Sequence, residues 1–255
     1  MSEGKKEILL GDCLELMKNI PNESIDAIIT DPPYGTTACK WDTVIPFDLM
    51  WEQLNRIIKP NGAIVLFGSE PFSSALRMSN IKNYKYDWVW NKKLSGGFAV
   101  AKYRPLSISE NISVFGKGAI KYNPQMVKGK MRLKGTTKKD GSDVSENWKG
   151  LKSGHNTIND LYFPKTILEI SNANRRGKNH PTQKPIELME YLIKTYTNEN
   201  ETILDFTAGS FTTSIACLNT KRNYICMEKE QKYFDIGMKR IEDWHNENNS
   251  KLNNK

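Results

Sequence analysis

The 255-residue sequence contains few of the residues that build metal sites and disulfides. It has four cysteines, Cys13, Cys39, Cys217 and Cys226, and only three histidines. The cysteines lie far apart and form no CxxC pair, which argues against both a cysteine zinc site and a disulfide framework. We therefore expect no bound metal.

Long apolar runs are also missing. No stretch approaches the roughly 18 apolar residues of a membrane-spanning helix, and the start MSEGKKEILLGD lacks the apolar core of a secretory signal. Hydrophobic residues make up 38% and charged residues 26%, a balance typical of a chain that folds. We expect a soluble, cytoplasmic protein with one substantial domain, either alone or with an insertion.

Positive charge is in excess, and one segment carries the excess. The chain has 37 Lys and Arg against 29 Asp and Glu, a net charge of +8. Residues 117–178 hold 14 basic and 5 acidic residues, which leaves 23 basic and 24 acidic residues elsewhere. This segment is rich in Gly, Lys, Asn, Ser and Thr, so we predict an insertion or mobile lobe. Clustered basic residues favour contact with a polyphosphate, although a solvated loop whose lysines aid solubility is an equal alternative.

Short apolar strands alternate with helical patterns on both sides of the basic segment. The expected strands are 7–10, 25–30, 63–67, 84–90, 111–115, 166–170, 202–205 and 223–227. The expected helices are 12–19, 46–58, 70–80, 185–196, 212–218 and 231–245, followed by a frayed tail. This alternation predicts an α/β fold with a largely parallel sheet covered on both faces, which binds ligands at the carboxyl ends of its strands.

The loop Asp31–Tyr34, of sequence DPPY, directly follows the apolar strand expected at 25–30. Its two prolines remove two amide donors and leave carbonyl acceptors, while Asp31 adds a carboxylate and Tyr34 a flat ring. An amino group on a ring fits this loop, because the carboxylate and a proline carbonyl could hold its two hydrogens while the ring stacks on Tyr34, as for a base flipped out of a duplex. A rigid turn with an ordinary aromatic is the simpler alternative.

Three further features at expected strand ends could meet a ligand. Asp205–Thr213 leads into a helix N-terminus, whose N–H groups suit a carboxylate or phosphate. Glu228 lies about twenty positions later, where a Rossmann-like fold holds ribose hydroxyls. The loop Asn179–Pro185 contains His180, but no partnered Ser, Cys or carboxylate pattern accompanies it, so positioning is a better interpretation than catalysis. Singly these signals are weak, since many such turns contain Gly and Ser and Glu228 could simply begin a helix.

Together these strings resemble the permuted (beta-type) DNA amino-methyltransferases, the N6-adenine and N4-cytosine enzymes that use S-adenosyl-L-methionine. In that family a DPPY-type motif comes first, then a target-recognition region, an HPTQKP motif and a glycine-rich cofactor loop. Asp31–Tyr34, the basic segment, His180–Pro185 and Asp205–Thr213 follow that order, which is more specific than any single string. The resemblance implies a Rossmann-like methyltransferase fold with a mixed, mostly parallel sheet, a permuted motif order and a basic recognition insertion.

The resemblance also implies a role for individual residues. Those implied to act on the target amino group are Asp31, Pro32, Pro33 and Tyr34. Those implied to bind the cofactor are Asp12, His180, Thr182, Lys184, Asp205, Thr207, Gly209, Ser210, Thr212 and Glu228. In the basic segment, the residues expected on DNA are Lys128, Lys130, Arg132, Lys134, Lys138, Lys139, Asn147, Trp148, Arg175 and Arg176. The implied chemistry is direct, in-line transfer of a methyl group to the positioned amino nitrogen, without a covalent enzyme intermediate.

The cofactor loop departs from the family string Asp-Pro-Phe-x-Gly-Ser-Gly-Thr. Phe206 and Thr207 occupy the Pro and Phe positions, and Phe211 replaces the second Gly. Phenylalanine cannot approach a ligand as closely as glycine, and it resists a positive φ. We predict that Phe211 turns into the core; the other outcome is weaker cofactor binding.

Asp rather than Ser before Pro-Pro-Tyr favours adenine as the acceptor. The alternatives are an N4-cytosine methyltransferase, an RNA or protein amide methyltransferase, and a DNA-binding regulator that has lost catalysis. A ring-carbon methylase would need a cysteine nucleophile, usually after a proline, and none of the four cysteines follows a proline.

We expect a catalytic half at 1–116, the target-recognition insertion at 117–178, a cofactor-binding half at 179–245 and a disordered tail at 246–255. The expected partner is double-stranded DNA, and no membrane is expected. The sequence leaves open whether the protein forms a homodimer and whether it acts with a cognate restriction endonuclease or in a phage. We also expect Trp88 and Trp90 in a sheet strand, and a mobile loop at Lys92–Phe98 near the catalytic pocket.

Overall fold

The computed structural model describes residues 6–37, 39, 42–134, 157–172 and 183–253. Two compact units divide the chain. One contains residues 1–123 and 166–255, and the other contains residues 124–165.

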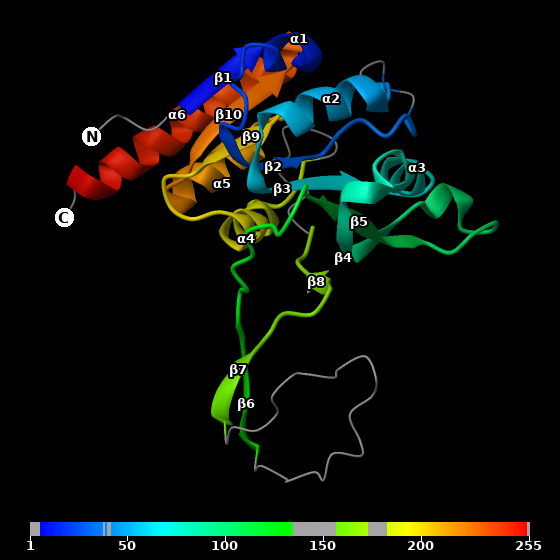
Figure 1. Ribbon diagram of the computed structural model, residues 1–255, viewed down its shortest axis with the longest axis vertical. Helices are drawn as coiled ribbons and strands as arrows, with labels where there is room; N and C mark the ends of the chain where they lie inside the picture. The colour runs from blue at the N-terminus through cyan, green and yellow to red at the C-terminus, as the bar shows by residue number, and fades with distance from the viewer. Residues whose placement is uncertain (1–5, 38, 40–41, 135–156, 173–182, 254–255) are drawn as a thin grey trace. The chain divides into compact units, whose positions relative to one another are not determined.

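The larger unit is built on an eight-stranded sheet with the strand order β1-β10-β9-β2-β3-β5-β4-β8 (Figure 1). The strands are β1 (Lys6–Leu10), β2 (Ile25–Thr30), β3 (Ile58–Gly68), β4 (Tyr84–Gly96), β5 (Ser107–Phe115), β8 (Ile167–Glu169), β9 (Thr202–Asp205) and β10 (Asn223–Glu228). All neighbours from β1 to β3 are parallel, as are β4 and β8, whereas β5 is antiparallel to both β3 and β4. The expected mixed, mostly parallel sheet is confirmed.

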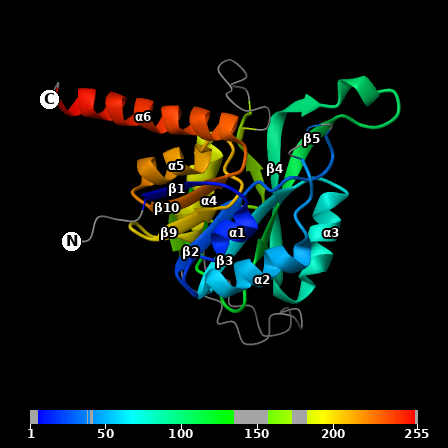
Figure 2. The ribbon, with the colours of Figure 1, turned by 90° about the horizontal axis from the view of Figure 1, so that it is seen from above.

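Helices cover both faces of this sheet (Figure 2). They are α1 (Cys13–Met17), α2 (Phe47–Ile57), α3 (Phe72–Ser79), α4 (Ile186–Tyr196), α5 (Thr212–Thr220) and α6 (Gln231–Asn253), with short 3₁₀ turns η1 (Ile81–Asn83) and η2 (Phe98–Val100). One apolar cluster joins the sheet to α1, α2 and α3, and a second joins it to α4, α5 and α6. No helix in the described ranges is both long and apolar enough to cross a membrane.

Strand β2 shows why the sequence folds this way. Its apolar run IDAIIT is buried on both faces, as expected for a central parallel strand. Ala27 and Ile29 belong to the cluster with α4 and α5, while Ile28, between them, belongs to the cluster with α1 and α2. The alternation of side chains along a strand therefore divides one apolar run between two cores.

Two expectations about element ends were wrong. The closing helix continues past His245 to Asn253, so the tail expected to be disordered from residue 246 is largely helical. Its later turns have local support, because Asn248 Nδ2 donates to Trp244 O at 2.8 Å and Trp244 Nε1 donates to Asn219 Oδ1 at 2.7 Å.

The segment Lys92–Phe98, expected to be a mobile loop, is strand as far as Gly96. Gly96 pairs with Ser107, so β5 supplies the backbone partner that extends the strand. Trp88 and Trp90 are buried in β4, which confirms their placement in the sheet.

The smaller unit contains an antiparallel pair of strands, β6 (Val127–Lys134) and β7 (Thr157–Tyr162). The Tyr162 hydroxyl donates to Lys130 O at 2.6 Å, and a Cβ on Gly129 would meet the Tyr162 ring at 2.7 Å. This unit covers residues 124–165 and is therefore shorter in sequence than the insertion predicted at 117–178.

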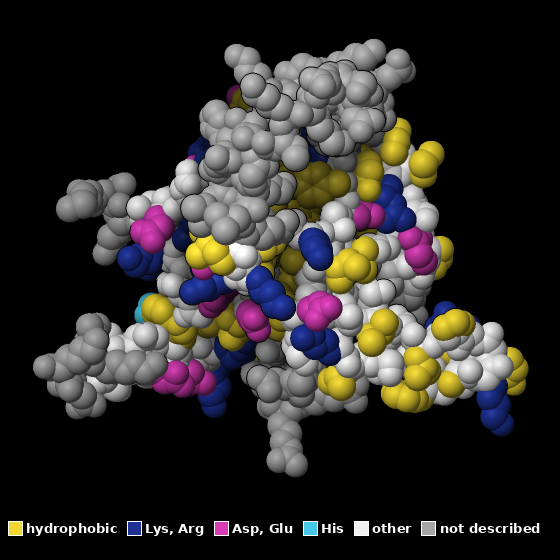
Figure 3. Space-filling model, turned by 90° about the horizontal axis from the view of Figure 1, so that it is seen from below, with side chains coloured by type: hydrophobic (Ala, Val, Ile, Leu, Met, Phe, Trp, Pro, Cys, Tyr) yellow, Lys and Arg dark blue, Asp and Glu magenta, His cyan; other side chains and the backbone are white. Residues whose placement is uncertain are grey.

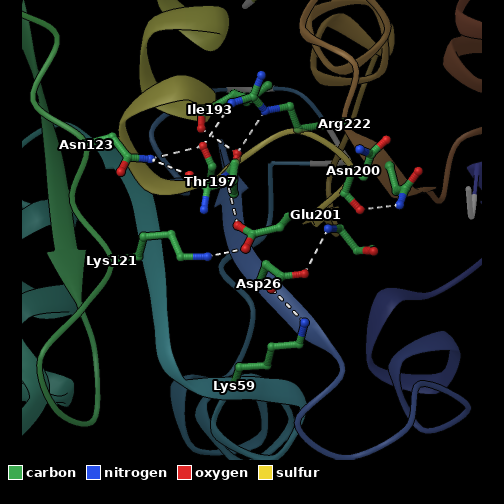
Figure 4. Close-up of polar contacts among 12 residues, drawn as sticks. Asp26, Lys59, Lys121, Asn123, Ile193, Thr197, Asn200, Glu201 and Arg222 are labelled. Carbon is green, nitrogen blue, oxygen red and sulfur yellow. Dashed lines mark hydrogen bonds and ion pairs between the residues drawn. The ribbon is translucent and has the colours of Figure 1, made fainter.

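A polar network holds the amino ends of β2 and β9 (Figure 4). Asp26 accepts from Lys59 Nζ at 2.6 Å and from Thr202 N at 2.9 Å. Arg222 donates to Thr197 O at 2.9 Å. These contacts secure the sheet edge opposite to the one where parallel α/β folds bind ligands.

Candidate active site

Loops at the carboxyl ends of β1, β2, β9 and β10 meet around a cavity of about 490 Å³. The four strands are parallel, so their carboxyl ends share one edge of the sheet. The lining contains two lysines, Lys184 and Lys229, and seven acidic residues: Asp12, Asp31, Asp42, Glu110, Asp205, Glu228 and Glu230. A cavity with this excess of carboxylates favours a ligand that carries positive charge and hydroxyl donors.

Asp31 is the most heavily contacted residue of the DPPY loop. Its Oδ1 accepts from the Tyr34 hydroxyl at 2.5 Å, and its Oδ2 accepts from Lys184 Nζ at 2.5 Å. Its backbone oxygen accepts from Thr207 Oγ1 at 3.0 Å, which joins this loop to the one after β9. Burial raises the pKa of the Asp31 carboxyl, against the opposing effect of the Lys184 ammonium.

Tyr34 has a fixed ring position. The ring stacks on Phe72 of α3 with a centroid distance of 5.1 Å and an interplanar angle of 27°. Burial, reinforced by Asp31, raises the pKa of the hydroxyl well above its ordinary value. The hydroxyl therefore stays neutral and donates to Asp31.

Asp42 organises the backbone that follows the DPPY loop. Its two carboxylate oxygens accept from Gly35 N at 2.9 Å, Thr36 N at 2.9 Å and Thr37 N at 2.6 Å. Three charge-assisted hydrogen bonds from consecutive amides hold this loop against the cavity wall.

Lys184 lies between two carboxylates. Besides its bond to Asp31, its Nζ lies 3.3 Å from Glu110 Oε2, and Lys92 Nζ lies 3.1 Å from the other Glu110 oxygen. Burial would lower the pKa of Lys184, but Asp31 and Glu110 raise it. Burial would raise the pKa of Glu110, but the two lysines lower it. The opposite charges therefore stabilise the ionised forms of Lys184 and Glu110.

Asp205 is enclosed by hydroxyl groups. Thr30 Oγ1 and Thr213 Oγ1 donate to its two oxygens, and Thr207 N donates to Oδ1 at 3.3 Å. The residue is only 4% exposed, and this burial raises the pKa of its carboxyl to about 6.

Glu228 holds the turn after β9 in contact with β10. Its Oε2 accepts from Gly209 N at 2.8 Å, and its Oε1 accepts from Glu230 N at 2.7 Å. Gly209 has a φ of 54°, a conformation that glycine adopts without a Cβ clash. Each oxygen of Glu228 retains capacity to accept a further hydrogen bond from a ligand hydroxyl. Asp12 caps α1 by accepting from Leu14 N at 3.0 Å.

Phe211 is directed away from the cavity, as predicted. It is fully buried and packs edge-to-face on Phe234 of α6, with ring centroids 5.7 Å apart. Its φ is 58°, so the backbone keeps the left-handed conformation usually given to glycine. Gly237 of α6 makes room for the ring, because a Cβ there would lie 2.2 Å from Phe211 Cδ2.

The family comparison identifies this arrangement. The family described as DNA methylase, of the N6/N4 methyltransferases, matches residues 25–239. The chain belongs to this DNA methylase family.

Individual relatives agree with the family assignment. The DNA adenine methyltransferase YhdJ of Escherichia coli (strain K12) is 27% identical over 250 residues, covering 93% of this chain and 83% of the relative. The type II methyltransferase M.HinfI of Haemophilus influenzae is also 27% identical and covers 92% of this chain and 67% of its own length. A crystal structure of an M1.HpyAVI–SAM complex is 26% identical, with a TM-score of 0.60, and covers 92% of this chain and 98% of that one. The PvuII DNA methyltransferase (cytosine-N4-specific) shares the fold at 18% identity and a TM-score of 0.66, over 92% of this chain and 85% of that one.

This methylase therefore transfers methyl groups from S-adenosyl-L-methionine, the cofactor of its family. The cavity fits that cofactor on its own chemistry. The sulfonium and ammonium charges suit a carboxylate-rich lining, and the ribose hydroxyls suit an acceptor such as Glu228.

The structure brings together most of the predicted site of this methylase. All four residues of the DPPY loop line the cavity, and so do the cofactor candidates Asp12, Lys184, Asp205, Thr207, Gly209, Ser210, Thr212 and Glu228. Lys184, predicted to meet the cofactor, also contacts Asp31. His180, Thr182, Lys138, Lys139, Asn147, Trp148, Arg175 and Arg176 lie outside the described residues.

The remaining DNA candidates lie on the smaller unit. Lys128 and Lys130 are exposed on β6, and Lys128 Nζ lies 3.9 Å from Asp160 Oδ2. Arg132 and Lys134 contribute their backbones to β6. The described part of the chain holds no group of His, Cys, Asp and Glu arranged to bind a metal ion.

Sequence reasoning missed three residues of this methylase site. Glu110 and Asp42 line the cavity, and Arg240 Nη1 donates to Ser210 Oγ at 2.9 Å from α6. None of these three residues belongs to the sequence motifs that resemble the family. The one usable signal for Glu110 was its position just before the apolar strand pattern 111–115.

Proposed function

We propose that this DNA methyltransferase acts on the exocyclic N6 amino group of adenine within a short sequence of double-stranded DNA, after flipping the base into the cavity. The observation that carries the proposal is the position of Asp31, Pro32 and Tyr34 on the wall of a carboxylate-lined cavity. An acceptor pair beside an aromatic ring matches an amino group on a planar base.

In this proposal the DPPY loop orients the acceptor. Asp31 Oδ2 and the Pro32 carbonyl accept the two amino hydrogens, so the nitrogen lone pair is directed out of the base plane. Tyr34, fixed by Phe72, packs against the base. Bound S-adenosyl-L-methionine supplies an electrophilic methyl group on its sulfonium. Positioning by these side chains provides the main part of the rate enhancement.

Lys184 has to exchange one partner when the base enters. Its ammonium group binds Asp31 Oδ2, the oxygen proposed to accept from the amino group of the base, and it also contacts Glu110. We propose that Glu110 keeps the ammonium beside Asp31 after this exchange. Lys184 can then donate to the ring nitrogen adjacent to the amino group. Asp31 as acceptor and Lys184 as donor would thus bind two neighbouring nitrogen atoms of the base.

The remaining site assignments complete the proposal. Asp205, Thr207, Gly209, Ser210 and Thr212 hold the methionine part of the cofactor. Glu228 accepts from the ribose hydroxyls, and Asp12 lies toward the adenine. Lys128 and Lys130, with the other basic residues of 117–178, neutralise DNA phosphates.

Asp at position 31 supports adenine over cytosine, and the relative YhdJ carries the name DNA adenine methyltransferase. N4-cytosine methylation is the second candidate, because the same acceptor pair fits either amino group.

The substitution Asp31→Ala tests the proposal. It removes the carboxylate that holds the amino group and leaves the basic surface intact, so we expect methylation with labelled S-adenosyl-L-methionine to fall by at least about a hundredfold while DNA affinity largely survives. The matched control is Asp48→Ala, at an exposed position on α2 outside the cavity lining, which should methylate as the wild type does. Retention of full activity by Asp31→Ala would contradict the proposal.

A further inference from the structure

Strands β4 and β5 continue past the sheet as an arm, residues 92–108, which projects at the right of Figure 1. Asn91 pairs with Ser109 and Gly96 with Ser107, and η2 closes the tip. The base of the arm belongs to the active site, since Trp90 and Glu110 are paired with each other and both line the cavity. The arm therefore begins at the wall of the catalytic pocket.

The arm exposes large apolar side chains. Tyr103 is 88% and Phe98 67% exposed, and Leu94, Leu106 and Ile108 are also exposed. Figure 3 shows hydrophobic side chains gathered with basic ones on this protrusion, at the lower right. Contiguous apolar surface of this kind marks interaction sites on soluble proteins.

The charge of the arm indicates the kind of partner. Residues 92–109 contain Lys92, Lys93, Lys102 and Arg104 and no Asp or Glu. Lys92 contacts Glu110, and Lys93 lies 3.6 Å from Glu169. No ion pair with a described residue engages Lys102 or Arg104, and both are exposed. Basic groups that flank an exposed tyrosine, without any carboxylate, suit a polyanion with flat rings and sugars more than they suit a second copy of the same positive arm.

We propose that the arm contacts the DNA duplex beside the flipped base, with Lys102 and Arg104 on phosphates and Tyr103 against a base or sugar. The inference rests on the proposed function, because it takes DNA as the substrate. The arm thus adds a DNA contact outside the predicted recognition segment 117–178.

The experiment compares DNA binding of the full-length wild type, Lys102→Gln/Arg104→Gln and Tyr103→Ala over a salt series, with a duplex that the wild type methylates and S-adenosylhomocysteine present. Loss of two phosphate contacts should weaken binding about tenfold or more near 0.1 M salt and lower the slope of log K against log salt by about two. Tyr103→Ala should weaken binding about fivefold or more.

The matched control is Lys6→Gln/Lys239→Gln, which removes two exposed charges on β1 and α6. It should keep the wild-type slope to within a few tenths, and all variants should bind S-adenosylhomocysteine as the wild type does, because none of these residues lines the cavity.

Wild-type DNA affinity in both arm variants and a wild-type salt slope in Lys102→Gln/Arg104→Gln, together with normal methylation by the wild type, would overturn the arm proposal and leave the proposed function standing. A change from dimer to monomer in sedimentation, with unchanged DNA affinity, would also overturn it by showing a self-association surface. A wild type that methylates no DNA would overturn the proposed function itself.

Discussion

Replacement of Gly237 by alanine should destabilise this protein when Phe211 is present and stabilise it when Phe211 is absent. The reason is the contact between the cofactor loop and α6. A Cβ on Gly237 would lie 2.2, 2.5 and 2.7 Å from three atoms of the Phe211 ring. The ring has nowhere to move, because it is fully buried and packs on Phe234.

The expected magnitudes have opposite signs in the two backgrounds. With Phe211 in place, overpacking by Gly237→Ala should lower the free energy of unfolding by about 1 to 3 kcal/mol. In the Phe211→Gly background the clash is gone, and alanine should raise it by about 1 kcal/mol through helix propensity. Phe211→Gly alone should cost about 1 to 4 kcal/mol, since about 3 to 5 kcal/mol of lost packing is offset by relief of about 1 to 2 kcal/mol of left-handed strain.

Urea unfolding of the four proteins in this cycle measures the coupling, which should be about 2 to 4 kcal/mol. A coupling below about 0.5 kcal/mol would refute the reasoning. Phe211 is not part of the cavity lining, so Phe211→Gly should retain methyl transfer at temperatures where it is folded. Loss of cofactor binding by folded Phe211→Gly would show that the ring supports the loop directly.

Two further predictions concern buried carboxylates. Burial raises the pKa of Asp205 from 3.8 to about 6, so the folded state holds this proton more tightly than the unfolded chain does. Its contribution to the free energy of unfolding should therefore fall as the pH rises from about 4 to 6, a slope that Asp205→Asn should lack in urea titrations; parallel curves for the two proteins would contradict this. The second prediction concerns Glu110→Gln, which weakens one of the two carboxylate contacts of Lys184. Lys184 should then bind Asp31 more tightly and compete more strongly with the amino group of the base. We therefore expect the KM for DNA to rise by about tenfold with unchanged cofactor affinity. Steady-state kinetics identical to the wild type would rule out the positioning role, and Glu52→Gln, on α2 outside the cavity lining, is the matched control.

Local pattern was sufficient for most elements and for much of the site. The apolar run of β2 is followed by Asp31 and that of β9 ends at Asp205, so both the strands and their ligand-facing ends can be read from the sequence. The burial of Phe211 was also predictable, since an aromatic ring at a glycine position has only the core as an alternative to the ligand.

Long-range pairing decided what local pattern could not. Lys184 reaches Asp31 across 153 positions, and Glu110 joins them from an antiparallel strand, so no spacing rule connects the three. Lys92–Phe98 was expected to be a mobile loop because its two glycines permit movement, but the pairing of Gly96 with Ser107 of β5 makes it strand as far as Gly96. The length of α6 was underestimated because its last turns are polar, and polar composition alone does not end a helix.

The central claim is the base that receives the methyl group. Wild-type protein should be incubated with mixed-sequence double-stranded DNA and labelled S-adenosyl-L-methionine, and the DNA then digested to nucleosides for mass spectrometry. The account predicts label in N6-methyladenine, confined on mapping to one short sequence. Label in N4-methylcytosine, or no label in DNA at all, would contradict it.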